Sequence, residues 1–312
     1  MNKKKFKSVL VVLGGTSGER AVSLESGKAC IKALKKKGYR ISTFDPKFKN
    51  FNLINKKKID VIFNALHGRD GEDGVAQSYF EYLKIPYTHS GVISSFNAMN
   101  KVISKKIFLK NRIKTPKFIT INRFNYKKNE IKKRLNKEKI NYPIVLKPIN
   151  EGSSLGVEIC KKKEKLENSV MRLLKKYHEL ILEEFIGGQE VQVAVINGNP
   201  IGAIELIPKR LFYDYKAKYT KKAKTKHVMP ARLSQKKLAE VLIIAQKTHK
   251  ALNCRGVTRS DFKFYNNNFF LLEINTQPGM TSLSLVPEIA NYKGITFENL
   301  VEKILLDASI SR

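Results

Sequence analysis

The first third of the chain alternates short apolar segments with helical patterns, and this alternation limits the folds open to it. Residues 7–15 read as a buried strand, and residues 22–39 have the spacing of an amphipathic helix. Two more strands are expected at 40–45 and 60–68, followed by a helix near 76–85. Strands that alternate with helices build a parallel sheet covered by helices, so the sequence predicts an α/β fold.

The rest of the chain carries two further groups of elements. A second unit is expected from Asn97, with a helix at 100–112 and strands at 117–121 and 142–148. A third unit begins within 180–188 and includes more strands, a hairpin and a C-terminal helix. A chain of 312 residues can bury the core that two or three such domains need.

The hairpin lies near the C-terminus, where the segments TRSDFKFY and FFLLEIN flank three asparagines. If the hairpin is centred on Asn267, Asp261 faces Glu273 and Arg259 faces Asn275, with all four side chains on one face. A turn with an even number of residues would separate Asp261 from Glu273.

Two facing carboxylates repel each other unless a cation lies between them or one is protonated. Because carboxylate and amide oxygens suit a hard cation, a divalent ion held by Asp261, Glu273 and Asn275 is the simpler interpretation. The alternative is a strand end whose polar groups are solvated.

Two glycine-rich loops suggest binding of anionic groups. Residues 13–20 (LGGTSGER) follow a strand and open a helix, but their spacing is not that of a dinucleotide-binding turn. A tight turn explains these glycines and leaves Glu19, at a helix N-terminus, unexplained. Residues 150–157 (NEGSSLGV) instead join two strands, as a flap over phosphates would, with Lys147 just before them. An ordinary hairpin with a snorkelling lysine is the alternative.

The chain carries 60 Lys and Arg against 27 Asp and Glu, a net charge of +33. Such charge is typical of nucleic-acid binders, but the lysine runs lack interleaved aromatic residues, so solvated lysine-rich faces are the preferred interpretation and no nucleic acid is expected. Three scattered cysteines indicate a reducing cytoplasm. The apolar run VLVVL is shorter than the roughly 7–15 residues of a secretory core, and no segment approaches the roughly 20 that span a bilayer, so no membrane partner is expected.

Several motifs together resemble the D-alanine–D-alanine ligase family of the ATP-grasp superfamily. They are LGGTSGERAVSLESG, NALHGRDGEDG, KPINEGSSLGV, FYDYKAKY, TRSDF and LEINTQPGMTSLSLVP, in the family's order over essentially the whole chain. The resemblance implies three domains: a Rossmann-like parallel-sheet domain at 1–96 and the two ATP-grasp domains at 97–184 and 185–312. It also implies a cytoplasmic homodimer.

The resemblance implies that ATP phosphorylates one D-alanine and that a second D-alanine attacks the acyl phosphate. Asp261, Glu273 and Asn275 match ligands of Mg²⁺ or Mn²⁺, with two ions expected. The residues that match the nucleotide site are Lys101, Lys147, Glu183, Glu184, Phe185, Ile186, Glu190 and Lys218.

The resemblance also assigns the amino-acid site. Glu19 matches the group that pairs with the first substrate's ammonium, and His67, which is otherwise a structural histidine, lines that pocket. Arg259 and the Gly279 N–H match oxyanion stabilisers, and Ser284 with the Leu285 N–H matches the second substrate's carboxylate site.

Residues 208–226 form a long basic and aromatic segment that is either a disordered insert or a lid over the acyl phosphate. Ser153 and Tyr219 match a hydrogen-bonded group with Glu19 that closes such a lid. Tyr219, which is Phe in some relatives that make an ester, favours the amide product, although D-lactate and D-serine remain open as second substrates. Asn100, Thr258 and Ser260 depart from the family pattern, and we expect these departures to alter packing only.

Overall fold

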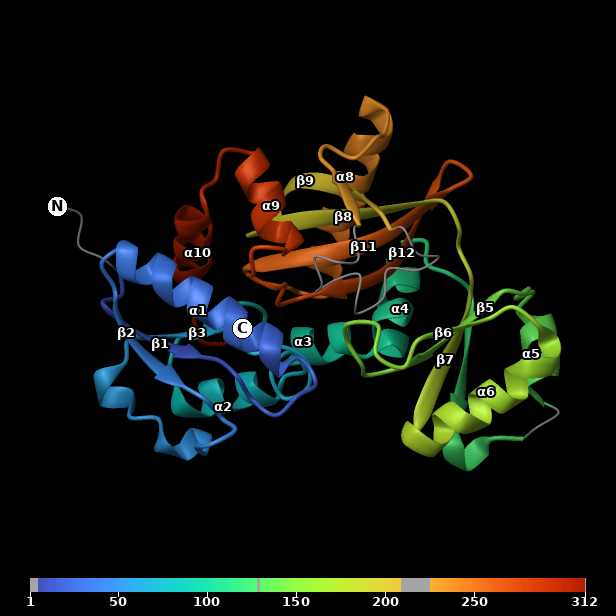
Figure 1. The fold of residues 1–312 in the computed structure, drawn as a ribbon, viewed down its shortest axis with the longest axis horizontal. Helices are drawn as coiled ribbons and strands as arrows, with labels where there is room; N and C mark the ends of the chain where they lie inside the picture. The colour runs from blue at the N-terminus through green and yellow to red at the C-terminus, as the bar shows by residue number, and fades with distance from the viewer. Residues whose placement is uncertain (1–4, 128–129, 209–224, 312) are drawn as a thin grey trace.

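Residues 5–127, 130–208 and 225–311 are described by the structure, a computed structural model. Their strands form three sheets, which Figure 1 shows side by side along the molecule. Within this part of the chain, no helix combines the length and apolar character that crossing a bilayer requires.

The N-terminal sheet is parallel and confirms the predicted α/β class. Its order is β2 (Arg40–Phe44), β1 (Ser8–Val12), β3 (Val61–Asn64). The apolar run of β1 is central and buried on both faces, as a strand between two helical layers must be. The helices of this part are α1 (Arg20–Lys36) and α2 (Val75–Leu83), and the short 3₁₀ turns Phe51–Leu53 and Lys56–Lys58 lie between β2 and β3.

The central sheet is antiparallel and amphipathic. Its order is β4 (Phe118–Asn122), β7 (Glu179–Glu184), β5 (Ile144–Pro148), β6 (Glu158–Cys160), with helices α5 (Glu130–Lys137) and α6 (Lys163–Lys176) and the 3₁₀ turn Arg123–Asn125. Alternate residues such as Leu146 and Leu182 enter the core that α5 and α6 complete. Lys147 and Glu183, in the intervening positions, therefore belong to the opposite face.

The C-terminal sheet is also antiparallel and has helices on both faces. Its order is β10 (Lys226–Val228), β9 (Asn199–Ile207), β8 (Gln189–Ile196), β11 (Val257–Tyr265), β12 (Asn268–Asn275). One face packs against α8 (Gln235–Ala251), and the other against α9 (Leu285–Tyr292). α10 (Phe297–Leu306) then packs against α1.

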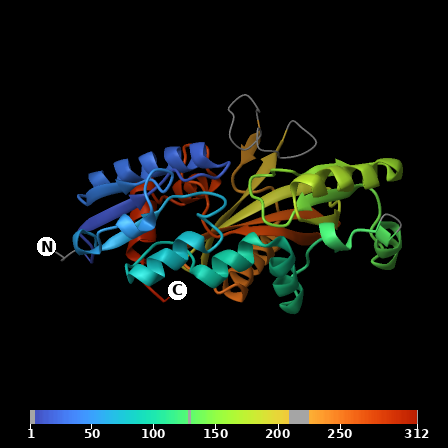
Figure 2. The same ribbon diagram turned by 90° about the horizontal axis from the view of Figure 1, so that it is seen from below.

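The N-terminal and C-terminal parts share one hydrophobic core. Buried residues of β1 and α1 belong to the same cluster as those of β8, α9 and α10. Figure 2 shows the red C-terminal helices beside the blue N-terminal sheet. The boundaries at 96/97 and 184/185 stay a prediction; residues 96 and 97 lie within one helix, α3 (Val92–Met99).

The helix α4 (Lys101–Lys110) begins with a capped N-terminus immediately after α3. The Asn100 side chain accepts hydrogen bonds from the N–H groups of Val102 (3.1 Å) and Ile103 (3.0 Å). Asparagine is as good a cap as aspartate, so this departure from the family pattern preserves the local structure.

The hairpin places the predicted residues opposite one another, but not for the predicted reason. Asp261 pairs with Glu273 and Arg259 with Asn275, as expected. The prediction of a turn centred on Asn267 is wrong, because the turn consists of Asn266 and Asn267 only.

A β-bulge restores the expected pairing. Asn266 and Asn267 both have positive φ (45° and 61°), as the tightest hairpin turns require. The register then shifts between Asp261 and Phe262, where Leu272 is the extra residue of β12. The one-residue slip from the even turn is thereby cancelled before the carboxylates are reached.

We expect His249 to make the fold sensitive to acid. Its Nδ1 lies 2.9 Å from the Thr258 hydroxyl, and burial lowers the pKa of His249 to about 4, which Asp307 opposes only in part. The unfolded chain binds a proton at about pH 6.5, so the free energy of unfolding should fall by about 2 kcal/mol between pH 7 and pH 5 through this residue. Urea unfolding at both pH values measures it.

The variant His249→Gln should lose less stability over this range, because glutamine does not titrate. The exposed His178 supplies the control, and His178→Gln should behave like the native protein. An unchanged pH dependence in His249→Gln would contradict the assignment.

Candidate active site

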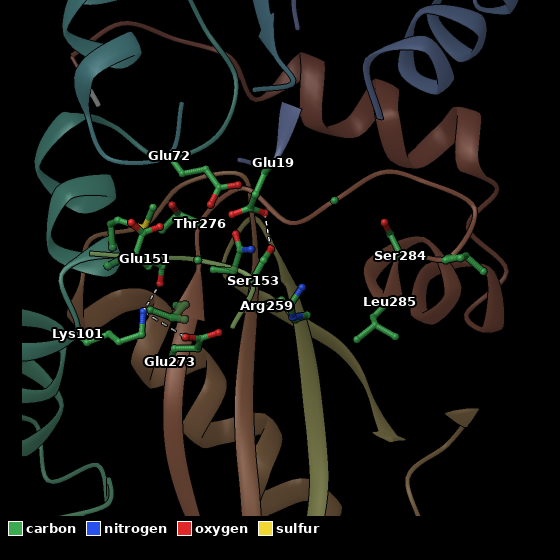
Figure 3. Close-up of a pocket in the computed structure, with 17 residues that line it drawn as sticks. Glu19, Glu72, Lys101, Glu151, Ser153, Arg259, Glu273, Thr276, Ser284 and Leu285 are labelled. Carbon is green, nitrogen blue, oxygen red and sulfur yellow. Dashed lines mark hydrogen bonds and ion pairs between the residues drawn. The ribbon is translucent and has the colours of Figure 1, made fainter. Parts of the chain in front are cut away.

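A cleft lies where the three sheets meet, and loops from all three line it. Figure 3 shows Glu19 and Glu72 from the N-terminal part, Ser153 from the 150–157 loop and Glu273 from β12 around one pocket. A neighbouring pocket is lined by Lys147, Glu190, Asp261 and further residues. Both pockets include Lys101, Glu151 and Glu273, so they meet at these side chains.

Glu19 closes one end of the cleft. It is the residue before α1 and is 5% exposed, and its Oε2 accepts a hydrogen bond of 2.5 Å from the Ser153 hydroxyl. The 150–157 loop therefore reaches the N-terminal part, as the sequence predicts for Ser153. A Cβ on Gly152 would lie 2.5 Å from Glu19 Oε1, so any other residue would require the Glu19 carboxylate to shift.

His67 lies behind the cleft, and Glu72 takes the position at its surface. His67 Nδ1 is 2.7 Å from Glu72 Oε1, and its Nε2 is 3.2 Å from the Ser26 hydroxyl. Ser26 in turn accepts from the N–H of Met280 (3.1 Å). Burial raises the pKa of Glu72, which the contact with His67 opposes and the nearby Glu19 reinforces. His67 thus orients a carboxyl group beside Glu19.

Arg259 and Asp261 form a bidentate ion pair on the cleft face of β11. The guanidinium nitrogens Nε and Nη2 lie 2.7 and 2.9 Å from the two oxygens of Asp261. Glu273, across the hairpin, lies 3.8 Å from the ammonium of Lys101. The Asn275 Oδ1 accepts from the Gln277 N–H at 2.7 Å. The side-chain oxygens that could bind a metal ion therefore already have partners within the protein, which a bound cation would partly displace.

The donor set fits a hard divalent cation. Two carboxylates and one amide oxygen lie on one face of the hairpin, and oxygen ligands of this kind suit Mg²⁺ or Mn²⁺. In the described part of the chain, no three His, Cys, Asp or Glu side chains are grouped so that they could hold a metal ion. Gln192, paired in register with Asp261, has a fully buried amide without a hydrogen-bond partner among the described residues.

Three charged residues lie together at the second pocket, and one of them, Lys147, lines it. Lys147 Nζ is 2.6 Å from Glu183 Oε2, and Lys105 Nζ is 3.1 Å from Glu183 Oε1. Burial lowers the pKa of Lys105 to about 8, although Glu183 opposes the shift. Burial alone would raise the pKa of Glu183, but the two ammonium groups outweigh it and the pKa falls below its usual value.

The end of β7 and the two residues after it are not among the residues that line these two pockets. Glu184 donates its N–H to Lys117 O (2.9 Å) and Phe185 donates to Pro143 O (3.3 Å), while Ile186 is buried. Glu190 does line the second pocket, together with Lys147 and Asp261, and Lys263 Nζ lies 3.1 Å from its Oε2.

The N-terminus of α9 bounds the other end of the cleft. Ser284 precedes the helix, and with Leu285 it lines the pocket that Figure 3 shows. The Ser284 hydroxyl lies 2.9 Å from both the N–H and the hydroxyl of Thr281. A Cβ on Gly279 would lie 2.8 Å from the same hydroxyl, so this glycine lets the chain pass close to Ser284. Free N–H groups at such a helix end attract a carboxylate.

Comparisons with known proteins agree with this geometry. Residues 107–306 match the family model "D-ala D-ala ligase C-terminus" and residues 44–90 match "D-ala D-ala ligase N-terminus". The chain is 55% identical over 307 residues to the D-alanine–D-alanine ligase of Pelagibacter ubique, with 98% of this chain and 99% of that protein covered. The chain belongs to the D-alanine–D-alanine ligase family.

Solved structures of the ligase family share the fold. The ATP complex of the D-alanine–D-alanine ligase from Bacillus anthracis superposes with a TM-score of 0.83 at 29% identity, covering 96% of this chain and 97% of that one. The D-Ala:D-Ser ligase VanG from Enterococcus faecalis gives 0.83 at 27% identity, covering 96% and 98%. The resemblance that the motifs predicted is confirmed, and so is the ATP-grasp architecture.

The individual site assignments stay predictions, although the structure brings most of these residues together. Glu19, Ser153, Arg259, Gly279, Ser284 and Leu285 line one pocket with Lys101, Glu273 and Asn275, while Lys147, Glu190 and Asp261 line the next. Lys218 and Tyr219 lie outside the described residues.

Sequence reasoning missed two residues of this region. Glu72 lies in the quoted motif NALHGRDGEDG, five residues after His67, and was passed over there. Lys105 follows Lys101 by four residues, which places both on one face of α4, but that spacing does not stand out among 60 basic residues.

Proposed function

We propose that this protein joins two D-alanine molecules with ATP through a D-alanyl phosphate, and so supplies the dipeptide for peptidoglycan precursors. The observation that carries the proposal is the meeting of two pockets at Lys101 and Glu273. One pocket has carboxylates for an ammonium group and a helix N-terminus for a carboxylate. The other has two lysines and a flap loop for phosphates. A phosphoryl group is transferred where they join.

The proposed reaction has two steps. A carboxylate oxygen of the first D-alanine attacks the γ-phosphorus of ATP, and ADP leaves. The amine of the second D-alanine then attacks the acyl carbon, loses a proton, and phosphate leaves. Bound divalent ions would supply charge neutralisation for the phosphates.

The side chains of the cleft act by position and charge. Glu19, held by Ser153, accepts the first ammonium, and Ser284 with the Leu285 N–H binds the second carboxylate. Arg259 and the Gly279 N–H stabilise the oxyanion of the tetrahedral intermediate. Lys101 and Lys147 bind phosphate groups, and Glu190 binds the ribose hydroxyls. We place adenine beside Glu183, Glu184, Phe185 and Ile186, and we assign Lys218 and Tyr219 to a lid over the reacting groups.

We further propose two Mg²⁺ or Mn²⁺ ions held by Asp261, Glu273 and Asn275, and domains at 1–96, 97–184 and 185–312. We propose a cytoplasmic location, which the three buried cysteines support because all three are free thiols.

A homodimer is supported by the neighbouring helices α2 and α3, which expose the large apolar side chains Tyr82 and Ile93. Light scattering of the purified protein tests the dimer through its mass.

The substrate assignment is tested by ADP release and by the product. D-alanine with Mg²⁺ should give ADP, phosphate and D-alanyl-D-alanine, whereas L-alanine should give background release, and so should D-alanine without a divalent ion. D-serine and D-lactate, offered with D-alanine, test the second site, which matters because VanG is a D-Ala:D-Ser ligase. Mass spectrometry identifies the product. No dipeptide from D-alanine alone would contradict the proposal.

A further inference from the structure

Lys105 is a buried cation to which the proposed reaction gives no task. It lies on α4, its side chain is 0% exposed, and its Nζ donates to the Thr115 hydroxyl at 2.5 Å. The Thr115 hydroxyl in turn donates a hydrogen bond of 2.8 Å to the carbonyl oxygen of Leu271 in β12. The ammonium also lies 3.1 Å from Glu183. Lys105 is therefore held at a defined place between the central sheet and the strand that carries Glu273.

Glu183 is shared between two lysines of different exposure. Its side chain is 1% exposed, that of Lys105 is 0% exposed, and that of Lys147 is 12% exposed. Lys147 lines the nucleotide-side pocket, whereas Glu183 and Lys105 do not line it. Of these three side chains, Lys147 is therefore the one that reaches the cleft.

The charges of this group do not cancel. Lys147 and Glu183 alone would form a neutral ion pair at 2.6 Å, with little field left for an anion. With Lys105 the three side chains carry a net charge of +1, and the carboxylates of Glu273 and Glu190 act on it from the cleft side. The phosphates of a nucleotide in the cleft would add negative charge beside Lys147, which lines the pocket.

We propose that Lys105 is a positioning residue for ATP. Its ammonium pairs with one oxygen of the Glu183 carboxylate, so the Lys147 ammonium, which pairs with the other oxygen, keeps a net positive charge toward the phosphates. This inference deepens the proposed function, because it rests on the nucleotide occupying the pocket beside Lys147. Glu183 then serves as the bridge between two lysines, with its carboxylate directed at them.

The test is ADP binding by titration calorimetry with the full chain and Mg²⁺. Lys105→Met should weaken ADP binding by about tenfold or more, because Lys147 is then neutralised by Glu183. Adenosine, which lacks phosphates, should bind as it does to the native protein, and the KM for D-alanine should not change.

A charge-restoring double variant separates this role from a structural one. Lys105→Met with Glu183→Gln removes one charge of each sign and leaves Lys147 at +1. Because Glu183 is also placed beside adenine, the readout is the ratio of ADP affinity to adenosine affinity, which should return to within about threefold of the native ratio. A purely structural lysine would not be rescued by a second core substitution. Thr115→Val is the matched control, since it removes the hydrogen bond to Lys105 and keeps every charge.

Each result decides the inference. Equal losses for ADP and adenosine in Lys105→Met would overturn it and assign the effect to the base site. A folded double variant whose ratio of ADP to adenosine affinity stays more than about tenfold below the native ratio would also overturn it, and this readout remains if the single variant does not fold. Failure of the native protein to bind ADP would instead contradict the proposed function.

Discussion

Replacing Glu273 by glutamine should lower D-alanine-dependent ADP release by about 10³-fold or more, with the fold retained. The carboxylate lies where the two pockets meet and faces Asp261 across the hairpin. In the proposed reaction Glu273 would help to hold divalent ions that neutralise the phosphates, and such charge stabilisation is worth several kcal/mol of barrier. Glutamine keeps the size of the side chain and removes its charge.

The measurement is steady-state ADP release over a range of Mg²⁺ concentrations, with circular dichroism as the check on folding. Glu240→Gln, which alters a surface pair with Lys237 on α8, should leave the rate unchanged. Activity near the native level in Glu273→Gln would remove this residue from the metal site.

Replacing Arg259 by lysine should lower kcat by about 10²–10³-fold, which corresponds to about 3 kcal/mol of lost transition-state stabilisation. Lysine retains the charge but lacks the planar fork that now holds both oxygens of Asp261. We expect the KM for ATP to change much less than kcat, because the oxyanion forms only after the nucleotide has reacted.

Separate measurements of kcat and of the KM for ATP test this assignment. The neighbouring Lys263→Arg keeps a cation beside Glu190 and should alter the nucleotide parameters alone. If Arg259→Lys raised the KM for ATP without lowering kcat, Arg259 would belong to nucleotide binding and not to oxyanion stabilisation.

The β11–β12 hairpin shows how far a sequence pattern can predict structure. The alternation along TRSDF and LLEIN predicts which side chains share a face, but Asp261 pairs with Glu273 only because the bulge cancels the slip of the even turn. The turn type and the bulge at Leu272 were not predicted. The two-residue turn shifts the strand register by one residue, and the bulge shifts it back before the carboxylates. A bulge is a local departure from the ladder that no hydrophobic period reveals.

Sequence alone did not predict which of the neighbouring residues His67 and Glu72 lines the cleft. His67 was expected in the pocket, yet its two nitrogens are engaged by Glu72 and Ser26, and Glu72 lines the cleft. Motif spacing marks both residues and does not say which one lies in front. That order depends on how the 66–74 loop folds over the carboxyl end of β3.

The sequence by itself determined the local structure of this protein: the parallel N-terminal strands, the hairpin, the glycine loops and, through its motifs, the family. These depend on periodicity and backbone freedom, which act over a few neighbouring residues. Only the tertiary structure decided that Ser153 reaches Glu19 and that Lys105 shares Glu183 with Lys147. These contacts join residues that are far apart in the chain, and the energies of buried charges depend on distance and burial, which one-dimensional spacing does not contain.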